Sequence, residues 1–285
     1  MIVTEISGGL GNQMFKYAMA KNLTLKNKVD LKLDVTWFEK EKVNEASRNF
    51  GLNVFKISEE KANNQEIIRL KNKKTKNGKK FILYNLFFAN KSIYIKESYY
   101  KANKIISSNN IYLNGAWQSE KYFKDIRKEL LEIFSLKNQF IKFKENLKSE
   151  IKNSNSVSLH IRRSDYLIKS HKYKICNLQY YKKAINKIIL TEKNIKIFVF
   201  SDDIEWAKNN LKTDFSAIFI NGNKDYEDLI LMSLCKHNII ANSSFSWWGA
   251  WLNKNPNKIV IAPKNWFVNR KRNTKNLTPS EWIKI

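Results

Sequence analysis

Four short polar segments of the chain contain residue types that bind anions. They are SGGLGNQ near the amino terminus, LHIRRSD in the middle, FSDD further along and ANSSFS towards the carboxyl end. Arg162 and Arg163 carry planar, permanently charged guanidinium groups, which suit bidentate contact with phosphate. The glycines of the first segment permit a tight turn, and a helix that begins there or at ANSSFS leaves free amides for an anion. These residue types therefore favour a phosphate-bearing ligand.

Each segment also has an ordinary structural interpretation. HIRRSD can be a strand end with a surface ion pair, SGGLGNQ a strand–helix turn, and ANSSFS a helix N-cap. The first segment is neither the dinucleotide fingerprint, because Met14 replaces its third glycine, nor a P-loop. Residues 160 and 162 alternate along a strand end, so Arg162 shares a face with His160 and Arg163 points the other way. We expect one arginine to meet a ligand and the other to pair structurally, with Asp165 as a candidate partner.

The adjacent carboxylates Asp202 and Asp203 raise the question of a metal site. Neighbouring residues point in different directions, and no third ligand is evident. We therefore expect one aspartate to accept hydrogen bonds from a base or ribose and the other to cap the following helix. Cys176 and Cys235, with only three histidines, make neither a disulfide framework nor a His/Cys metal site. No metal is expected.

The elements that position these segments follow a regular order in the second part of the chain. From Ser156 onward, strand-like and helix-like segments alternate, ending with the expected final strand KIVIAP. The strands are short, β-branched and apolar on both faces, which is typical of a parallel sheet covered by helices on both sides. Such a doubly wound α/β fold binds ligands beyond the carboxyl ends of its strands, where all these polar segments lie.

The first part of the chain is less regular. MIVTEIS and VDLKLDV read as strands on either side of a helix with Phe15, Met19 and Leu23 on one face. Ser119 is a candidate N-cap for a single helix to residue 134, with one stripe formed by Tyr122, Ile126, Leu130 and Phe134. The polar segment 137–155 is expected to be helical and to act as a linker, and KNKKTKNGKK to be an exposed loop.

Composition narrows the classes of partner. The chain has 285 residues, and 52 basic against 26 acidic residues give a net charge of +26. Such an excess favours nucleic acid, an anionic membrane or phosphate-bearing substrates. Lys and Asn occur in almost every polar segment, so we interpret much of the charge as solvated surface. A nucleic-acid binder is the alternative from another class, but no basic and aromatic RNA-recognition pattern is visible, and no nucleic-acid partner is expected.

The amino terminus lacks the basic region and the apolar run of a secretory signal. No window reaches the ~20 apolar residues that a transmembrane helix requires. We therefore expect a cytoplasmic protein. Peripheral contact with the anionic inner face of the cytoplasmic membrane is compatible with this location and is left open.

Taken in order, GGLGNQMFKYAMA, HIRRSDY, VFSDDIEWAK and IIANSSFSWWGAWL resemble the α-1,2-fucosyltransferases, glycosyltransferase family eleven. The resemblance covers nearly the whole chain. It implies a GT-B-type α/β fold, with two Rossmann-like domains facing a central cleft. Residues 1–150 would form the acceptor-side domain and residues 151–285 the domain that binds GDP-fucose.

The reaction implied by the resemblance is inverting and metal-independent, and it needs no cofactor. L-fucose would pass from the substrate GDP-β-L-fucose to the 2-hydroxyl of a terminal galactose. The acceptor would be a surface glycan of the O-antigen or lipopolysaccharide type. A different linkage or donor is the alternative, and the acceptor is open because residues 37–110 match no motif.

The resemblance also implies roles for individual residues. His160 would contact the nucleotide, Arg162 the diphosphate and Asp202 the guanine. The remaining donor-binding residues would be Gly11, Asn12, Asn242, Ser243 and Ser244, with Asn12 facing the donor sugar. Arg162, Asp165 and Asn12 are the expected catalytic residues. Asp165 is the first candidate for the general base, and orientation of the hydroxyl by Asn12 without a dedicated base is the alternative.

The tryptophan-rich stretch FSWWGAWL is interpreted as structural. Trp247 and Trp251 share a helix face, and Trp248 is turned about 100° away from Trp247. Gly249 and Ala250 would let a neighbouring element approach closely. The tryptophans would then fix the start of the helix, where Ser243 and Ser244 are expected to face the diphosphate.

Overall fold

A computed structural model describes residues 1–39, 48–71, 93–97, 108–168, 170–212, 215–269, 274 and 276–285. The chain divides into two compact units, Met1–Lys137 and Asn138–Ile285. The boundary expected at residues 150/151 falls inside helix α5 (Glu145–Asn153), which belongs to the second unit. The segment was interpreted as a linker because most of its residues are polar. However, α5 packs on the second unit through the buried Ile151, which contacts the core that contains Phe198 and Leu231. Most of the expected loop KNKKTKNGKK lies outside the described residues.

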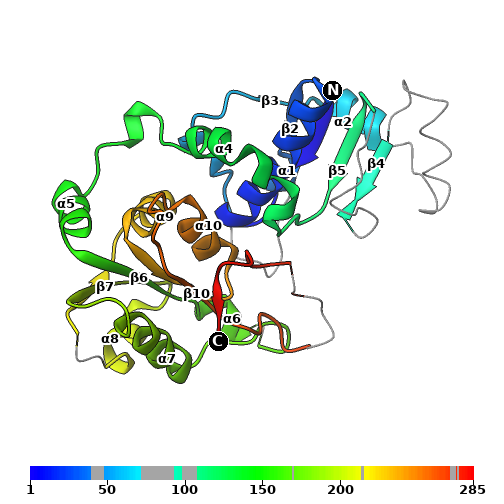
Figure 1. The fold of residues 1–285 in the computed structure, drawn as a ribbon. Coiled ribbons are helices and arrows are strands. Elements are labelled where there is room, and N and C mark those ends of the chain that lie inside the picture. Colours follow the sequence, from blue (N-terminus) through cyan, green and yellow to red (C-terminus); the bar gives the residue numbers. More distant parts are fainter. Residues whose placement is uncertain are drawn as a thin grey trace. The chain divides into compact units, whose positions relative to one another are not determined.

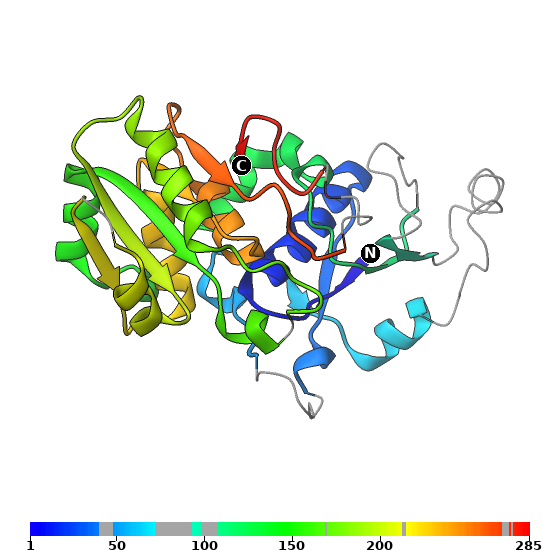
Figure 2. The ribbon, with the colours of Figure 1, turned by 90° about the horizontal axis from the view of Figure 1, so that it is seen from below.

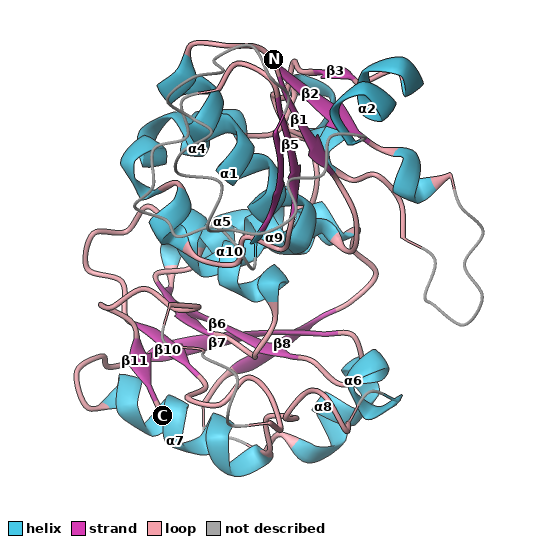
Figure 3. Ribbon diagram, turned by 90° about the vertical axis from the view of Figure 1, so that its right-hand side faces the viewer, coloured by secondary structure: helices cyan, strands magenta, loops and turns pink. Residues whose placement is uncertain are grey.

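The first unit contains a parallel sheet in the order β3-β2-β1-β5-β4. The strands are β1 (Ile2–Glu5), β2 (Leu31–Asp34), β3 (Glu60–Lys61), β4 (Ile93–Lys96) and β5 (Ile111–Asn114). The α-helices among the described residues are α1 (Leu10–Asn27), α2 (Asn64–Lys71) and α4 (Arg127–Ile133). Figure 3 shows α1 and α2 on opposite faces of this sheet. Single 3₁₀ turns lie at Thr36–Phe38 and Leu52–Val54.

The single helix expected from Ser119 to residue 134 is wrong. The segment forms two 3₁₀ turns, Glu120–Tyr122 and Lys124–Ile126, before α4 begins. Ser119 is confirmed as an N-cap, because its side chain accepts a hydrogen bond from the backbone N–H of Lys121. Phe123 separates the two turns and is fully buried, with its ring 5.9 Å from that of Phe15 on α1. Burial of this ring, which local periodicity does not show, accompanies the break in the helix.

The second unit contains a six-stranded parallel sheet in the order β11-β10-β9-β6-β7-β8. The strands are β6 (Asn155–Ile161), β7 (Ile195–Ser201), β8 (Ala217–Ile220), β9 (His237–Ile239), β10 (Val260–Ala262) and β11 (Ile283–Lys284). Numbered from β6, this is the strand order 3-2-1-4-5-6 of a dinucleotide-binding fold. We expected β10 to be the last strand, but two residues at the end of the chain form β11 beside it. A two-residue strand has too short a pattern to be read from sequence.

Helices cover both faces of the second sheet. Besides α5, the described helices of this unit are α6 (Ser164–Ile168), α7 (Leu178–Ile189), α8 (Ile204–Asn210), α9 (Asp225–Leu234) and α10 (Ser244–Leu252), with a 3₁₀ turn at Asn138–Phe140. Figure 1 shows α7 and α8 on one face and α9 and α10 on the other. The parallel, doubly covered sheet predicted from the alternating segments is confirmed.

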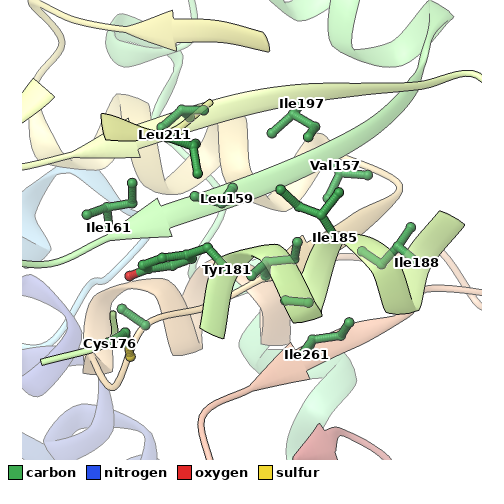
Figure 4. Packing of buried hydrophobic residues seen from close by; sticks show 14 of the residues in the cluster. Val157, Leu159, Ile161, Cys176, Tyr181, Ile185, Ile188, Ile197, Leu211 and Ile261 are labelled. Atoms are coloured by element: carbon green, nitrogen blue, oxygen red, sulfur yellow. The ribbon is translucent and has the colours of Figure 1, made fainter. Parts of the chain in front are cut away.

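Alternate residues of the central strands enter two different cores. Val157, Leu159 and Ile161 of β6 pack with Tyr181 and Ile185 of α7 on one face, as Figure 4 shows. On the other face, Phe198 and Phe200 of β7 pack with residues of α5 and α9. Burial of both faces leaves the polar residues inside these strands to bond with one another, as Asn238 of β9 does with Ser158 of β6. The exposed polar side chains follow the strand ends.

Candidate functional site

The polar segments of the second unit follow strands that lie side by side. Arg162 follows β6, Asp202 follows the neighbouring strand β7, and Ser243 comes shortly after β9 on the other side of β6. From β6 the chain adds β7 and β8 on one side, and it then crosses back to add β9 on the other side of β6. The switch point of the sheet therefore lies between β6 and β9. Ligands of doubly wound folds bind at such a switch point, beyond the carboxyl ends of the strands.

Arg162 is held by two carboxylates. Its guanidinium lies 2.7 Å from Oδ1 of Asp165, and its Nε lies 3.2 Å from Oδ2 of Asp202. The guanidinium also lies over the ring of Tyr166, 5.7 Å from its centroid. These contacts fix a planar cation at the end of the central strand. The division expected between a ligand-binding arginine and a structurally paired one is not observed, because both arginines pair with carboxylates. Asp165 pairs with Arg162, the arginine to which the resemblance assigns the diphosphate.

Asp202 also holds the backbone turn between β6 and α6. Its Oδ1 accepts a hydrogen bond from the N–H of Arg163 at 2.8 Å, and its Oδ2 accepts one from the N–H of Ser164 at 3.1 Å. Its described contacts therefore position Arg162 and this turn. Recognition of guanine by Asp202 stays a prediction.

The second arginine serves a separate structural pair. Nε of Arg163 lies 3.3 Å from Oδ2 of Asp203, and its guanidinium lies 3.7 Å from the centroid of the Trp206 ring. Asp203 also accepts a hydrogen bond from the N–H of Trp206 and so caps α8. The expectation that one of the two aspartates caps the following helix is confirmed.

His160 is buried, with 4% of its surface exposed, and its ring lies 5.8 Å from that of Phe245. Among the described residues, nothing forms a hydrogen bond with its Nδ1. Burial, with the nearby charge of Arg162 as a second cause, lowers the pKa of His160 to about 3. The imidazole is therefore neutral at physiological pH. Buried polar atoms normally have a partner, so this free Nδ1 is a candidate ligand contact.

The segment after β9 forms the start of α10. Ser243 is the N-cap, and its side chain accepts a hydrogen bond from the N–H of Phe245. Ser244 is the first residue of the helix and is partly exposed. The first amides of a helix have no partner within it and favour negative charge. The cap at Ser243 occupies the amide of Phe245, and diphosphate binding at Ser243 and Ser244 stays a prediction.

Asn242 has a structural environment. Its side-chain Nδ2 donates to the carbonyls of Lys174 and Trp266 at 2.7 and 2.8 Å, and its own carbonyl accepts from the hydroxyl of Tyr166. Asn242 therefore ties three segments together beneath the start of α10. Its expected contact with a donor stays a prediction. Trp266 lies in no motif, and Tyr166 closes HIRRSDY without being given a role, so sequence reasoning missed both contacts.

The glycine-rich turn of the first unit lies at that sheet's own switch point, between β1 and β5. Gly8 has a φ of +82°, in the region that favours glycine, and Gly9 is the N-cap of α1 without a side-chain cap. Oδ1 of Asn12 accepts a hydrogen bond from Nε2 of Gln118, which follows β5. Gly11 lies within the first turn of α1 and is buried. Sequence reasoning missed Gln118, because no local pattern links it to Asn12.

A polar cluster accompanies this turn. Oε2 of Glu5 accepts a hydrogen bond from Asn114, and its Oε1 lies 3.5 Å from Nζ of Lys16, which also contacts Ser7. Lys16 is 7% exposed, and burial lowers its pKa against the opposing effect of Glu5. These residues were not predicted, since their types are common in exposed helices and strands.

Groups of three or more metal-ligating side chains are absent from the part of the chain that the structure describes. The charged groups that follow β6 and β7 include Arg162 with its two carboxylate partners and the pair of Arg163 with Asp203. These charged groups, the start of α10 and the buried His160 all lie beyond the carboxyl ends of neighbouring strands. Binding of a nucleoside diphosphate there stays a prediction.

The glycosyl transferase family 11 model matches residues 1–285. The chain belongs to this family. It is 36% identical to the alpha-1,2-colitosyltransferase of Escherichia coli, over 100% of this chain and 99% of the relative. It is also 34% identical to the O-antigen biosynthesis glycosyltransferase WbnK of Escherichia coli, over 98% of this chain and 99% of that protein. The protein is therefore a glycosyltransferase, as predicted.

Solved fucosyltransferase structures share the fold of this family 11 chain. The α-1,6-fucosyltransferase NodZ, co-crystallized with GDP, matches 87% of this chain and 91% of its own, with 13% identity and a TM-score of 0.54. FUT1 of Arabidopsis thaliana, in a mutant form with GDP, matches 98% of this chain and 75% of its own, with 11% identity and a TM-score of 0.54. With two parallel sheets in the chain, the predicted GT-B-type α/β fold is confirmed.

Proposed function

We propose that this family 11 glycosyltransferase transfers L-fucose from GDP-β-L-fucose to the 2-hydroxyl of a terminal galactose in a surface glycan of the O-antigen type. The observation that carries the proposal is the buried His160, with its unpartnered Nδ1, beside Arg162 and the start of α10. A neutral ring nitrogen suits a nucleotide hydroxyl or phosphate, and the cation with the helix amides suits a diphosphate. The names of the relatives support the glycan class.

The proposed reaction is a single displacement. The oxygen of the acceptor hydroxyl forms a bond to the anomeric carbon, the bond from that carbon to the β-phosphate oxygen breaks, and GDP leaves with the electron pair. Attack from the opposite side converts the β-linked donor into an α-fucoside. Arg162 and the amides of α10 stabilise the charge that develops on the leaving phosphate.

Asp165 and Asp202 are proposed to hold Arg162 in position for this step. Removal of one such pre-positioned charge donor typically costs about 100–1000-fold in rate. For the proton of the attacking hydroxyl, we keep Asp165 as the candidate acceptor and orientation by Asn12 as the alternative. In the first role, Asp165 would have to exchange its contact with Arg162 for one with the hydroxyl.

Colitose is a second candidate for the transferred sugar. The 36% identity to a colitosyltransferase favours it specifically. Colitose is L-fucose without the hydroxyl at carbon 3. A site built to hydrogen-bond a hydroxyl discriminates strongly against the sugar that lacks it, whereas an apolar site discriminates weakly. The two donors can therefore be separated by their relative rates.

The deciding experiment offers GDP-fucose and GDP-colitose to the purified protein with a panel of β-galactosides, and the product linkage is read by NMR. We expect an α-1,2-linked fucoside, with kcat/KM for GDP-fucose above that for GDP-colitose and unchanged by EDTA. Faster transfer of colitose would replace the proposed donor. A product of another linkage, or transfer that EDTA abolishes, would contradict the proposed reaction.

A further inference from the structure

Three exposed apolar side chains of the second unit lie in segments that contact each other. Leu167 and Ile168, at the end of α6, are 46% and 81% exposed, and Val268, after β10, is 51% exposed. Isolated exposed apolar residues are common and need no explanation, whereas a group of them marks an interaction surface. We call Leu167, Ile168, Val268 and the segments 170–174 and 264–269 the α6 surface.

Backbone pairing joins the two segments of the α6 surface. Tyr173 and Phe267 form an antiparallel bridge, and the N–H of Val268 donates to the carbonyl of Lys172 at 3.2 Å. The ring of Tyr173 stacks on that of Tyr166 in α6, with centroids 4.4 Å apart and planes inclined by 10°. Figure 2 shows these green and orange segments running side by side. The surface is thus held in place by backbone and ring contacts.

The charge on the α6 surface has one sign. The chain has no Asp or Glu from residue 166 to 191, and none from residue 229 to 280. His171, Lys172, Lys174 and Lys264 are all exposed there. Asp165, the acidic residue just before this surface, is paired with Arg162. Exposed apolar side chains and exposed cations therefore occur together in these two segments, which contain no Asp or Glu of their own.

We propose that the α6 surface docks on an anionic lipid membrane. Apolar side chains that enter the headgroup region, with lysines that attract anionic lipids, are the two components of peripheral membrane binding. Charge selects this partner over a second copy of the chain, because each copy carries a net charge of +26 and would bring cations against cations. The helices of the described residues include no candidate membrane span.

Docking would bring the candidate active site to the membrane. The ring of Tyr166 stacks on the α6 surface through Tyr173, lies beneath the guanidinium of Arg162, and its hydroxyl donates to the carbonyl of Asn242. An acceptor glycan carried on a lipid would then be close to the donor. This consequence rests on the proposed function, whereas the docking itself does not.

The experiment is flotation of the whole protein with vesicles of phosphatidylglycerol and phosphatidylcholine, compared with phosphatidylcholine alone. We expect binding to the anionic vesicles at low salt and its loss at high salt, because the attraction is screened. Ile168→Ser should reduce the vesicle partition coefficient about tenfold, since the apolar contact is lost. Leu190→Ser is the matched control, because Leu190 is 76% exposed on another part of the unit, and it should bind like the wild type.

A second pair of variants tests the charge. Lys172→Glu should weaken binding at least about fivefold, the effect of one lysine near an anionic surface, whereas Lys187→Glu on α7 should have little effect. The proposal would be overturned if the wild type did not float at low salt or if Ile168→Ser floated as well as the wild type. It would also be overturned if a test variant and its matched control lost vesicle binding equally. So would sedimentation showing a dimer that Ile168→Ser dissociates. GDP binding, measured separately by calorimetry, shows whether a failure belongs to docking or to the proposed function.

Discussion

His160 and His237 are both buried histidines of the second sheet, with 4% and 3% of their surfaces exposed. Nδ1 of His237 accepts a hydrogen bond from the N–H of Ile259 at 3.0 Å, so it joins β9 to the start of β10. Nδ1 of His160 has no such partner in the described part of the chain. The same residue type is therefore structural at one end of the sheet and available at the other.

Leucine substitutions should separate these two roles. His160→Leu removes a buried unpaired polar atom, so the thermal stability of the free protein should be equal or higher, while GDP affinity falls about tenfold. His237→Leu leaves the N–H of Ile259 without its acceptor and should lower the free energy of unfolding by ~1–3 kcal/mol, with GDP affinity unchanged. Thermal denaturation and calorimetry of both variants measure these effects. Unchanged GDP affinity in His160→Leu would remove this residue from the site.

The adjacent arginines form a second matched pair at the residue scale. Arg162→Lys keeps a charge but loses the planar contact with a diphosphate, and we expect kcat/KM to fall about 100-fold or more. Arg163→Lys loses its stacking on Trp206 and should lower the melting temperature, with little change in kcat/KM. If kcat/KM depended on Arg163 and not on Arg162, the diphosphate contact would belong to Arg163 and our assignment would be wrong.

At the scale of the element, α10 is held by aromatic packing. Trp247, Trp248 and Trp251 are 1%, 0% and 3% exposed, and the rings of Trp247 and Trp251 stack with centroids 6.1 Å apart. Nε1 of Trp247 donates to the carbonyl of Leu277, near the end of the chain. The structural interpretation of this stretch is confirmed. The packing fixes the helix whose first amides we propose to face the diphosphate.

Gly249 sets how closely α9 and α10 approach. A Cβ at this position would lie 2.9 Å from Cβ of Met232 on α9, so one helix would have to move. Gly249→Ala should lower the free energy of unfolding by ~1–3 kcal/mol, although alanine is the better helix former. Gly9→Ala is the control, because nothing lies within 4 Å of a Cβ there. Urea unfolding measures both variants, and an equal or higher stability of Gly249→Ala would show that the helices adjust freely.

At the scale of the whole molecule, the two units share one arrangement of a parallel sheet and its polar residues. A sheet buried on both faces places its polar residues at a switch point, between β1 and β5 in the first unit and between β6 and β9 in the second. Burial also leaves two histidines neutral in the second unit. The pKa of His160 is lowered to about 3 and that of His237 is lowered as well, in each case mainly by burial.

These histidines make stability depend on pH. Unfolded histidine titrates near 6.5, so below this pH the unfolded chain binds more protons than the folded one, and stability falls as the pH is lowered. Each histidine contributes up to about 1.4 kcal/mol per pH unit. Asp228 has the opposite effect on stability between about pH 6 and pH 4. Burial raises its pKa to about 6, so in this range its carboxyl group binds a proton in the folded chain more readily than in the unfolded chain.

Thermal melts between pH 8 and pH 4 check this expectation in three proteins. The wild type should lose stability below about pH 6.5. His160→Leu should flatten the loss, and Asp228→Asn should steepen it below about pH 6, because the opposing group is gone. A wild-type stability that rises towards pH 5 would show that buried carboxyl groups outweigh the histidines.

The sequence by itself determined the alternating strands and helices, the α/β class and the polar segments at strand ends. Residues 156–262 could be read because short segments rich in apolar and β-branched residues alternate there with helical patterns, and the motif-bearing polar segments follow the strands. The N-cap Ser119 was also readable, as were a cap within ANSSFS and a cap by one of the two adjacent aspartates, since capping involves residues within one turn of each other.

Only the tertiary structure decided which polar residues meet. The pairing of Arg162 with Asp202, the contact of Asn12 with Gln118 and the unpartnered Nδ1 of His160 depend on strand order. Strand order is set by packing between segments distant in sequence, which leaves no local pattern. For the same reason, α5 joined the second unit and the α6 surface became visible only when residues 172–174 and 266–268 came together.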